Sequence, residues 1–162
     1  MTTYFISIQV LDMGNNTNLD FIISIIVAMI AGFCIGLERQ MKNKNAGLKT
    51  YTLVSVGSAI FTSISFEYTG IDFVDTARII SQVIVGVGFL GAGVIVQGKH
   101  KISGLATAAT IWCSAGLGCL AALKMYTELL SATIIVVIIN MLFGYINSKI
   151  NRNKDNEIEI NN

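Results

Sequence analysis

The residue types that most often carry chemistry in proteins are scarce in this chain. Its three cysteines, Cys34, Cys113 and Cys119, lie inside apolar runs without a CxxC pair, and its one histidine, His100, stands between two lysines. This spacing fits neither a zinc site nor a disulfide framework. One histidine in a loop also cannot supply a nucleophile, a base and an orienting group. We therefore expect no enzyme, no catalytic residue, no metal site and no cofactor.

A glycine-rich string matches a motif for dinucleotide binding. The segment Gly86–Gly91 reads GVGFLG and matches GxGxxG, whose glycines let the pyrophosphate of a dinucleotide approach a helix N-terminus. The acidic residue expected about twenty positions later is absent, because no Asp or Glu occurs between Gly91 and Glu128. The flanks continue as apolar sequence of membrane length. We interpret these glycines as packing residues instead of a cofactor site.

Small residues recur four apart elsewhere in the chain, which is typical of helices whose backbones approach closely within a membrane. The predicted helix-packing residues are Ala28, Gly32, Gly36, Gly86, Gly88, Gly91 and Gly93. For the last four an alternative stays open. They can also loosen their helix and free carbonyl groups to line a polar site.

Two segments carry hydroxyl side chains at steps of three and four, so each set falls on one helix face. The sets are Ser55, Ser58, Thr62 and Ser65, and Ser103, Thr107, Thr110 and Ser114. Such faces can line a wet pathway, but hydroxyls also bond across helices or to the i−4 carbonyl, at about 0.6 to 2 kcal/mol each. We favour interhelical bonding. We also expect the indole N–H of Trp112, in mid-span, to find a partner within the bundle.

Arg78 and Gln82 lie four residues apart and share one helix face, with Asp75 a turn earlier. Arg78 can extend its charge to the membrane interface, whereas the deeper amide of Gln82 needs a partner inside the bundle. We interpret the pair as one unit that holds this helix in register, with a ligand or ion site as the alternative. No Asp or Glu lies deep in an apolar run, which argues against an intramembrane magnesium site.

The elements that position these residues follow from composition. Of the 162 residues, 53% are hydrophobic and only 13% are charged, and the mean hydropathy is +0.66. This excludes an ordinary soluble enzyme, and a net charge of +1 gives no basic field for nucleic acid. The apolar runs are Leu19–Leu37, Tyr51–Phe66, Ala77–Val96, Gly104–Leu123 and Leu129–Ile146. Runs of this length match a hydrocarbon core of about 30 Å, although the second is short.

We therefore predict an all-α integral membrane protein, a five-helix transmembrane bundle. Residues 1–18 form an extracytoplasmic N-terminal segment, residues 19–147 the five-span domain and residues 148–162 a disordered cytoplasmic tail. Lys and Arg stay preferentially on the cytoplasmic side. The first linker, the third linker and the tail hold nine of the eleven basic residues, and only Arg78 and Lys124 fall on the other side. The N-terminus is thus predicted outside and the C-terminus inside.

The strongest local pattern follows the first span, where Gly36–Gln40 reads GLERQ and Ala46–Thr50 reads AGLKT. Taken alone, adjacent opposite charges at a helix end indicate a topological stop. Further strings are LVSVGSAIF at 53–61, RIISQVIVGVGFLGAGVI at 78–95 and GLATAATIWCSAGLG at 104–118. Together they resemble the MgtC/SapB family of bacterial inner-membrane proteins.

The resemblance implies a multi-pass domain with a cytoplasmic C-terminus in the bacterial inner membrane, and an association with growth at low magnesium and with virulence. The motif positions it carries over as functional residues are Glu38, Arg39, Gln40, Lys49, Thr50, Arg78, Gln82, Thr107 and Thr110. The chain departs from the family in two respects. It has Ala106 where many members have a polar residue, and its short tail cannot supply the regulatory domain of longer members.

Two functions follow from these residues and the resemblance. The first is a non-enzymatic protein that supports magnesium or ion homeostasis by modulating a membrane partner, for which the resemblance alone suggests the ATP synthase. The alternative is a small oligomeric ion or solute permease lined by the hydroxyl faces. The expected partners are the lipid bilayer, a membrane protein complex and further copies of the chain, and no nucleic acid.

Cysteine labelling tests the predicted orientation. With Cys34, Cys113 and Cys119 replaced, Asn45→Cys should resist an impermeant thiol reagent in intact cells, because its linker is predicted to be cytoplasmic. Asn153→Cys should resist the reagent as well, and Asn16→Cys should react. The reverse labelling pattern would overturn the orientation.

Overall fold

The computed structural model describes residues 17–67, 75–99 and 102–160, so nearly all of the predicted N-terminal segment 1–18 lies outside the described residues. Within these ranges the chain forms five helices and one pair of short strands. The elements are α2 (Thr17–Met41), α3 (Leu48–Glu67), α4 (Thr76–Gly93), β1 (Val96–Gln97), β2 (Ile102–Ser103), α5 (Leu105–Ala122) and α6 (Tyr126–Ile160). The predicted all-α class is confirmed.

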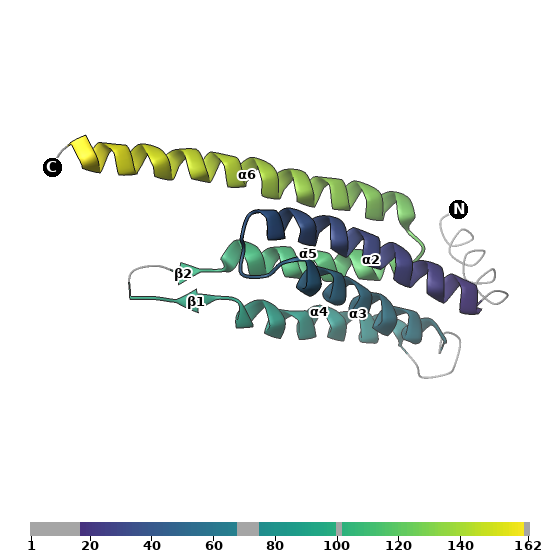
Figure 1. Ribbon diagram of the computed structural model, residues 1–162. Helices are drawn as coiled ribbons and strands as arrows, with labels where there is room; N and C mark the ends of the chain where they lie inside the picture. Colours follow the sequence, from purple (N-terminus) through teal and green to yellow (C-terminus); the bar gives the residue numbers. More distant parts are fainter. Residues whose placement is uncertain (1–16, 68–74, 100–101, 161–162) are drawn as a thin grey trace, which may run out of the picture.

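Successive helices run in alternating directions (Figure 1). The turn between α2 and α3, the β1–β2 hairpin and the far end of α6 therefore lie toward the same end of the bundle. Helices α2, α3 and α5 pack on one another, α4 lies against α3 and α5, and α6 lies against α2 and α5. At the other end, Lys124 Nζ pairs with Asp20 Oδ2 at 2.6 Å and ties the α5–α6 turn to the start of α2.

In the described part of the chain, three helices are long and apolar enough to cross a membrane, through Asn18–Met41, Leu105–Ala122 and Tyr126–Asn147, and Ala77–Gly93 is apolar but shorter. Helix α3 has seven serines and threonines, which lower its hydropathy. It tolerates them because it lies among α2, α4 and α5. The five-span arrangement and its orientation in the bilayer stay predictions.

The C-terminal region differs from the predicted disordered tail, because α6 continues to Ile160. Extending a helix that already exists costs far less than nucleating a new one. The chain has no proline to stop it. The polar composition of residues 148–162 therefore did not indicate where this helix ends.

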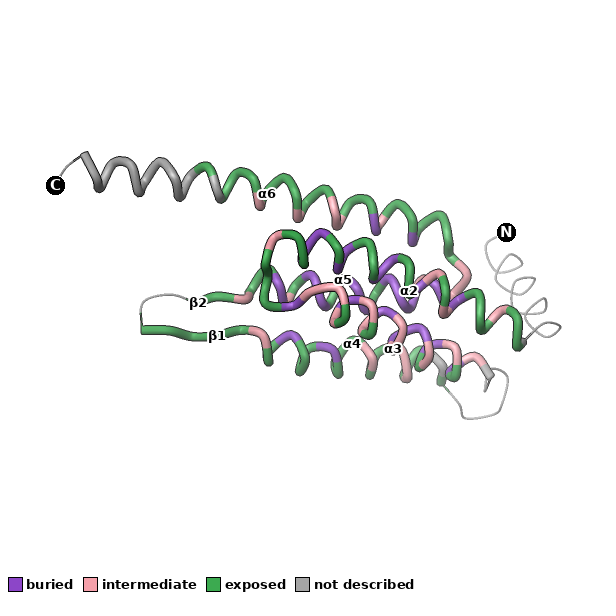
Figure 2. Tube along the Cα trace, in the orientation of Figure 1, coloured by how far each residue is buried: buried purple, intermediate pink, exposed green. Residues whose placement is uncertain are grey.

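The centre of the bundle is built on small residues. Buried positions lie on the facing sides of α2, α3 and α5, whereas α4 and α6 are mostly exposed (Figure 2). A Cβ atom added to Gly32 would lie 2.7 Å from the carbonyl oxygen of Tyr51, and one added to Gly36 would lie 2.6 Å from the Cα of Leu48. Ala28 is fully buried on the same helix. Helices α2 and α3 thus touch backbone to backbone.

The glycines of α4 behave differently from the prediction. Gly91 packs against Ala108 of α5, since an added Cβ would lie 3.6 Å from the Ala108 Cβ. Gly86, Gly88 and Gly93 would meet no atom within 4 Å among the described residues. The predicted close packing is therefore wrong for these three, because α4 contacts α5 through the face that carries Gly91.

Two glycines of α5 give a matched test of this packing. A Cβ at Gly118 would collide with the carbonyl oxygen of Ser55, while one at Gly116 would meet nothing within 4 Å. Gly118→Ala should destabilise the bundle by about 1 to 3 kcal/mol through overpacking. Gly116→Ala should be neutral or stabilising by up to about 1 kcal/mol through helix propensity. Melting temperatures in detergent measure both, and equal effects would contradict the backbone contact.

Candidate functional site

The hydroxyl groups predicted to share helix faces are largely buried in α3 and α5, but Ser103 lies on β2 and is exposed, so its place on the second face was predicted wrongly. Ser55 donates a hydrogen bond to the carbonyl of Ala28 at 2.8 Å, and Ser114 donates to the carbonyl of Tyr51 at 2.9 Å. Thr62 donates to the sulfur of Cys119 at 3.3 Å, across the α3–α5 contact. All of these donors are buried. Their hydroxyl groups serve helix association.

A second polar group lies where α2 ends, and we call it the Arg39 cluster: Arg39, Tyr51, Thr107, Thr110 and Asn140. The side chain of Arg39 is only 4% exposed. Its Nη1 donates to Asn140 Oδ1 and its Nη2 donates to Thr107 Oγ1, each at 3.3 Å. One guanidinium thus joins α2, α5 and α6.

The remaining bonds of the cluster are also long. Thr110 Oγ1 lies 3.3 Å from Asn140 Oδ1, and Tyr51 donates to the carbonyl of Thr107 at 3.4 Å. Thr110 has a closer acceptor in the Ala106 carbonyl, at 2.7 Å. Hydrogen bonds between oxygens are usually about 2.7 to 2.8 Å. The contacts that join the helices in this cluster are therefore loose.

Glu38 and Lys42 border the cluster on α2. Lys42 Nζ lies 2.7 Å from Glu38 Oε1 and donates to the carbonyl of Asn140 at 3.1 Å. Gly144 leaves room for this lysine, because an added Cβ would lie 2.9 Å from its Nζ. The Glu38 side chain is 9% exposed, and its two carboxylate oxygens are buried without a hydrogen-bond partner among the described residues. Glu38 therefore forms its ion pair with Lys42, and Arg39 forms none among the described residues.

Gln40 has a local role. Its Oε1 accepts a hydrogen bond from the backbone N–H of Leu48 at 3.3 Å and so caps the first turn of α3. Gly47 makes space, since an added Cβ would collide with that same oxygen. Lys49 is exposed and Thr50 is partly buried, and neither side chain has a hydrogen bond or ion pair among the described residues. Within the linker motif, Arg39 therefore belongs to the Arg39 cluster and Gln40 caps a helix.

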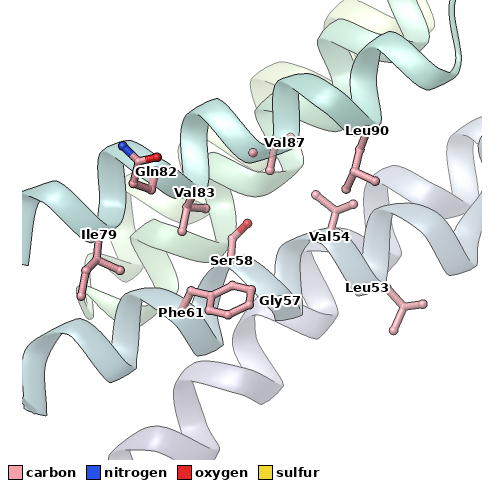
Figure 3. A pocket seen from close by; sticks show the side chains of 11 residues that line it. Leu53, Val54, Gly57, Ser58, Phe61, Ile79, Gln82, Val83, Val87 and Leu90 are labelled. Carbon is pink, nitrogen blue, oxygen red and sulfur yellow. The ribbon is translucent and has the colours of Figure 1, made fainter.

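Arg78 and Gln82 do not join this site, and both are exposed. Gln82 borders an apolar groove of about 460 Å³ between α3 and α4, together with residues such as Phe61 and Ile79 (Figure 3). The expectation that its amide is satisfied inside the bundle is wrong, because Gln82 is exposed at the edge of this groove and makes no hydrogen bond among the described residues. No hydrogen bond or ion pair in the described part of the chain links the two side chains.

Trp112 is a further correction, since its side chain is 54% exposed and not enclosed in the bundle. Tyr51, Lys42 and Asn140 were not predicted from the sequence as members or neighbours of the cluster. Asn140 carried a usable signal, because it is the one amide in the apolar run Leu129–Ile146. A lone amide at that depth needs a partner.

These features define a class, an α-helical membrane protein with a buried polar cluster at one end of its bundle. The family model described as MgtC family matches residues 25–149, which include every member of the Arg39 cluster. The chain belongs to the MgtC family.

Similar proteins come from several bacteria. Protein MgtC of Salmonella typhimurium strain LT2 is 42% identical over 132 residues, covering 82% of this chain and 56% of that protein. The Escherichia coli K12 protein named "Putative magnesium transporter YhiD" is 45% identical over 113 residues, covering 66% and 53%. Protein MgtC of Brucella abortus is 40% identical over 115 residues, covering 71% and 48%. The chain thus spans about half the length of these relatives. No solved structure matches it.

Truncating Asn140 tests whether the cluster holds α6. Asn140→Ala removes the acceptor used by Arg39 Nη1. It should cost about 1 to 3 kcal/mol, because a buried donor then loses its partner. Asn147→Ala, an exposed position on the same helix, is the control and should change little. Thermal unfolding in detergent compares them, and equal stability of the two variants would remove Asn140 from the cluster.

Proposed function

We propose that the chain supports magnesium homeostasis at the bacterial inner membrane by modulating a membrane partner, without enzymatic activity. Membership of the MgtC family supports a magnesium-related role at the membrane, and the name of the Escherichia coli relative supports the same role. The partner that the family resemblance suggests is the ATP synthase, which makes it the first candidate for co-purification. Because the chain covers about half of its relatives, this activity is proposed for the membrane domain alone.

One observation favours a modulator over a permease. A permease lined by the hydroxyl faces needs those oxygens to face a path that an ion can enter. Ser55 and Ser114 instead donate to backbone carbonyls of neighbouring helices, at 2.8 and 2.9 Å. Opening a path there would break these bonds and separate helices that touch through Gly32 and Gly118. Closed helix contacts suit a protein that acts through its surface.

The Arg39 cluster supports a functional role beyond packing. Burial of an arginine without a paired carboxylate costs stability. Arg39 is buried in this way, and it lies within the segment that matches the family model. Stability alone would be better served by an apolar residue of similar size. The cluster is therefore the part of the bundle we expect function to depend on.

Two assays separate the proposals. Proteoliposomes made from the purified chain should carry no magnesium, sodium or proton flux above empty vesicles. The same protein should restore growth of a deletion strain at low magnesium and co-purify with a membrane complex. Arg39→Gln should lose growth, while Lys44→Gln, which removes an equal charge from an exposed linker, should keep it. Saturable flux from the isolated protein would instead establish the permease.

A further inference from the structure

The Arg39 guanidinium is a buried cation that forms no ion pair among the described residues. It is 4% exposed, and its Nε has no hydrogen-bond partner among the described residues. Arginine stays protonated in proteins, so it cannot relieve burial by losing its charge. Glu38 is next to it in sequence, but its carboxylate pairs with Lys42. Glu38, Arg39 and Lys42 together leave one positive charge at this place.

The first turn of α5 adds to that positive potential. Thr107, which accepts from Arg39, belongs to this turn, and the helix begins after Gly104. Gly104 has a φ of 91°, and its position provides no side-chain cap. The N–H groups of an uncapped first turn favour a negative charge. The last turn of α2, which carries Arg39, has the opposite polarity and offsets part of the charge.

The buried polar atoms near this charge that have no hydrogen-bond partner among the described residues are two donors and both carboxylate oxygens of Glu38. Asn140 Nδ2 is buried without a partner among the described residues, like Arg39 Nε. The Tyr51 and Thr110 hydroxyls already donate to the carbonyls of Thr107 and Ala106, whereas the Thr107 hydroxyl donates no hydrogen bond among the described residues and can turn its hydrogen toward a ligand. The Asn140 carbonyl oxygen is the acceptor that both Arg39 and Thr110 approach, at 3.3 Å. A ligand carrying negative charge would supply acceptors for Arg39 Nε and Asn140 Nδ2, which one amide oxygen does not.

We propose that the Arg39 cluster and the first turn of α5 bind a small phosphate-type oxyanion. Guanidinium groups and helix N-termini both suit phosphate oxygens. Leu105 and Ala106, in the same first turn of α5, are exposed at the end of the bundle that is predicted to be cytoplasmic. The oxyanion comes either from free phosphate or from the headgroup of an anionic phospholipid. The site does not depend on whether the protein is a modulator or a permease.

The test uses the full chain in phosphatidylcholine nanodiscs, titrated with inorganic phosphate against sodium chloride of equal ionic strength. Phosphate should raise the melting temperature in a saturable way that chloride does not reproduce. A second arm replaces part of the phosphatidylcholine with phosphatidylglycerol. If the headgroup is the natural ligand, this lipid should raise the melting temperature and abolish the further effect of phosphate.

Two variants tie the effect to the site. Arg39→Gln should weaken phosphate binding at least about tenfold, because it removes a charge-assisted contact. Lys44→Gln, on the exposed linker, should bind as the parent does. Asn140→Asp places a carboxylate where Arg39 already donates, so it should raise the melting temperature without ligand and abolish the phosphate effect. Asn147→Asp, exposed on the same helix, should do neither.

Asn140→Asp keeps the proposal testable even if Arg39→Gln does not fold. Parent protein that responds to neither phosphate nor phosphatidylglycerol would overturn the site. Wild-type phosphate affinity in Asn140→Asp would overturn it as well. Both outcomes are independent of the flux and growth assays, so the oxyanion site and the proposed function can fail separately.

Discussion

The close approach of α2, α3 and α5 is the constraint on which the rest of this structure depends. Lipid tails are as apolar as leucine, so no hydrophobic force presses helices together inside a bilayer. Contact and hydrogen bonding must do so, and both need short distances between backbones. Gly32, Gly36 and Gly118 provide these distances. Ser55 reaches the Ala28 carbonyl, and Ser114 the Tyr51 carbonyl, only because the backbones already touch.

The same contact explains where the Arg39 cluster forms. Gly36 brings the last turns of α2 against Leu48, at the start of α3. Arg39 follows three residues later and is directed toward Thr107 of α5 and Asn140 of α6. Lys42 extends the link to α6 over Gly144. The tightly packed contact of α2, α3 and α5 thus ends at the loosely bonded Arg39 cluster. The packed contact holds the fold, whereas the cluster is the part we propose for binding.

Periodicity and composition were sufficient to predict the helices and their order, and the motifs were sufficient to predict the family. The contact at Gly32 and Gly36 was also predictable, because a four-residue repeat of small side chains is local information. The outward face of α4 was not, since Gly86, Gly88 and Gly91 look alike in sequence and only tertiary packing distinguishes them. Gln82 and Trp112 were misplaced for the same reason.

The Arg39 cluster could be predicted only in part, because nothing local connects Arg39, Thr107 and Thr110 to Asn140, which lies 101 positions after Arg39. The extent of α6 was missed because polar residues can extend a helix that the apolar segment has nucleated.

The buried hydroxyls of Ser55, Thr62 and Ser114 form hydrogen bonds between helices and do not line a water-filled path. Cysteine accessibility in native membranes tests this claim most directly, using Ser55→Cys and Ser114→Cys in a background without native cysteines, since serine and cysteine are similar in size. Both positions are buried. We predict that neither cysteine reacts with a water-soluble thiol reagent applied from either side. Rapid labelling of Ser114→Cys in folded protein would reveal a water-filled path and contradict a dry, closed bundle.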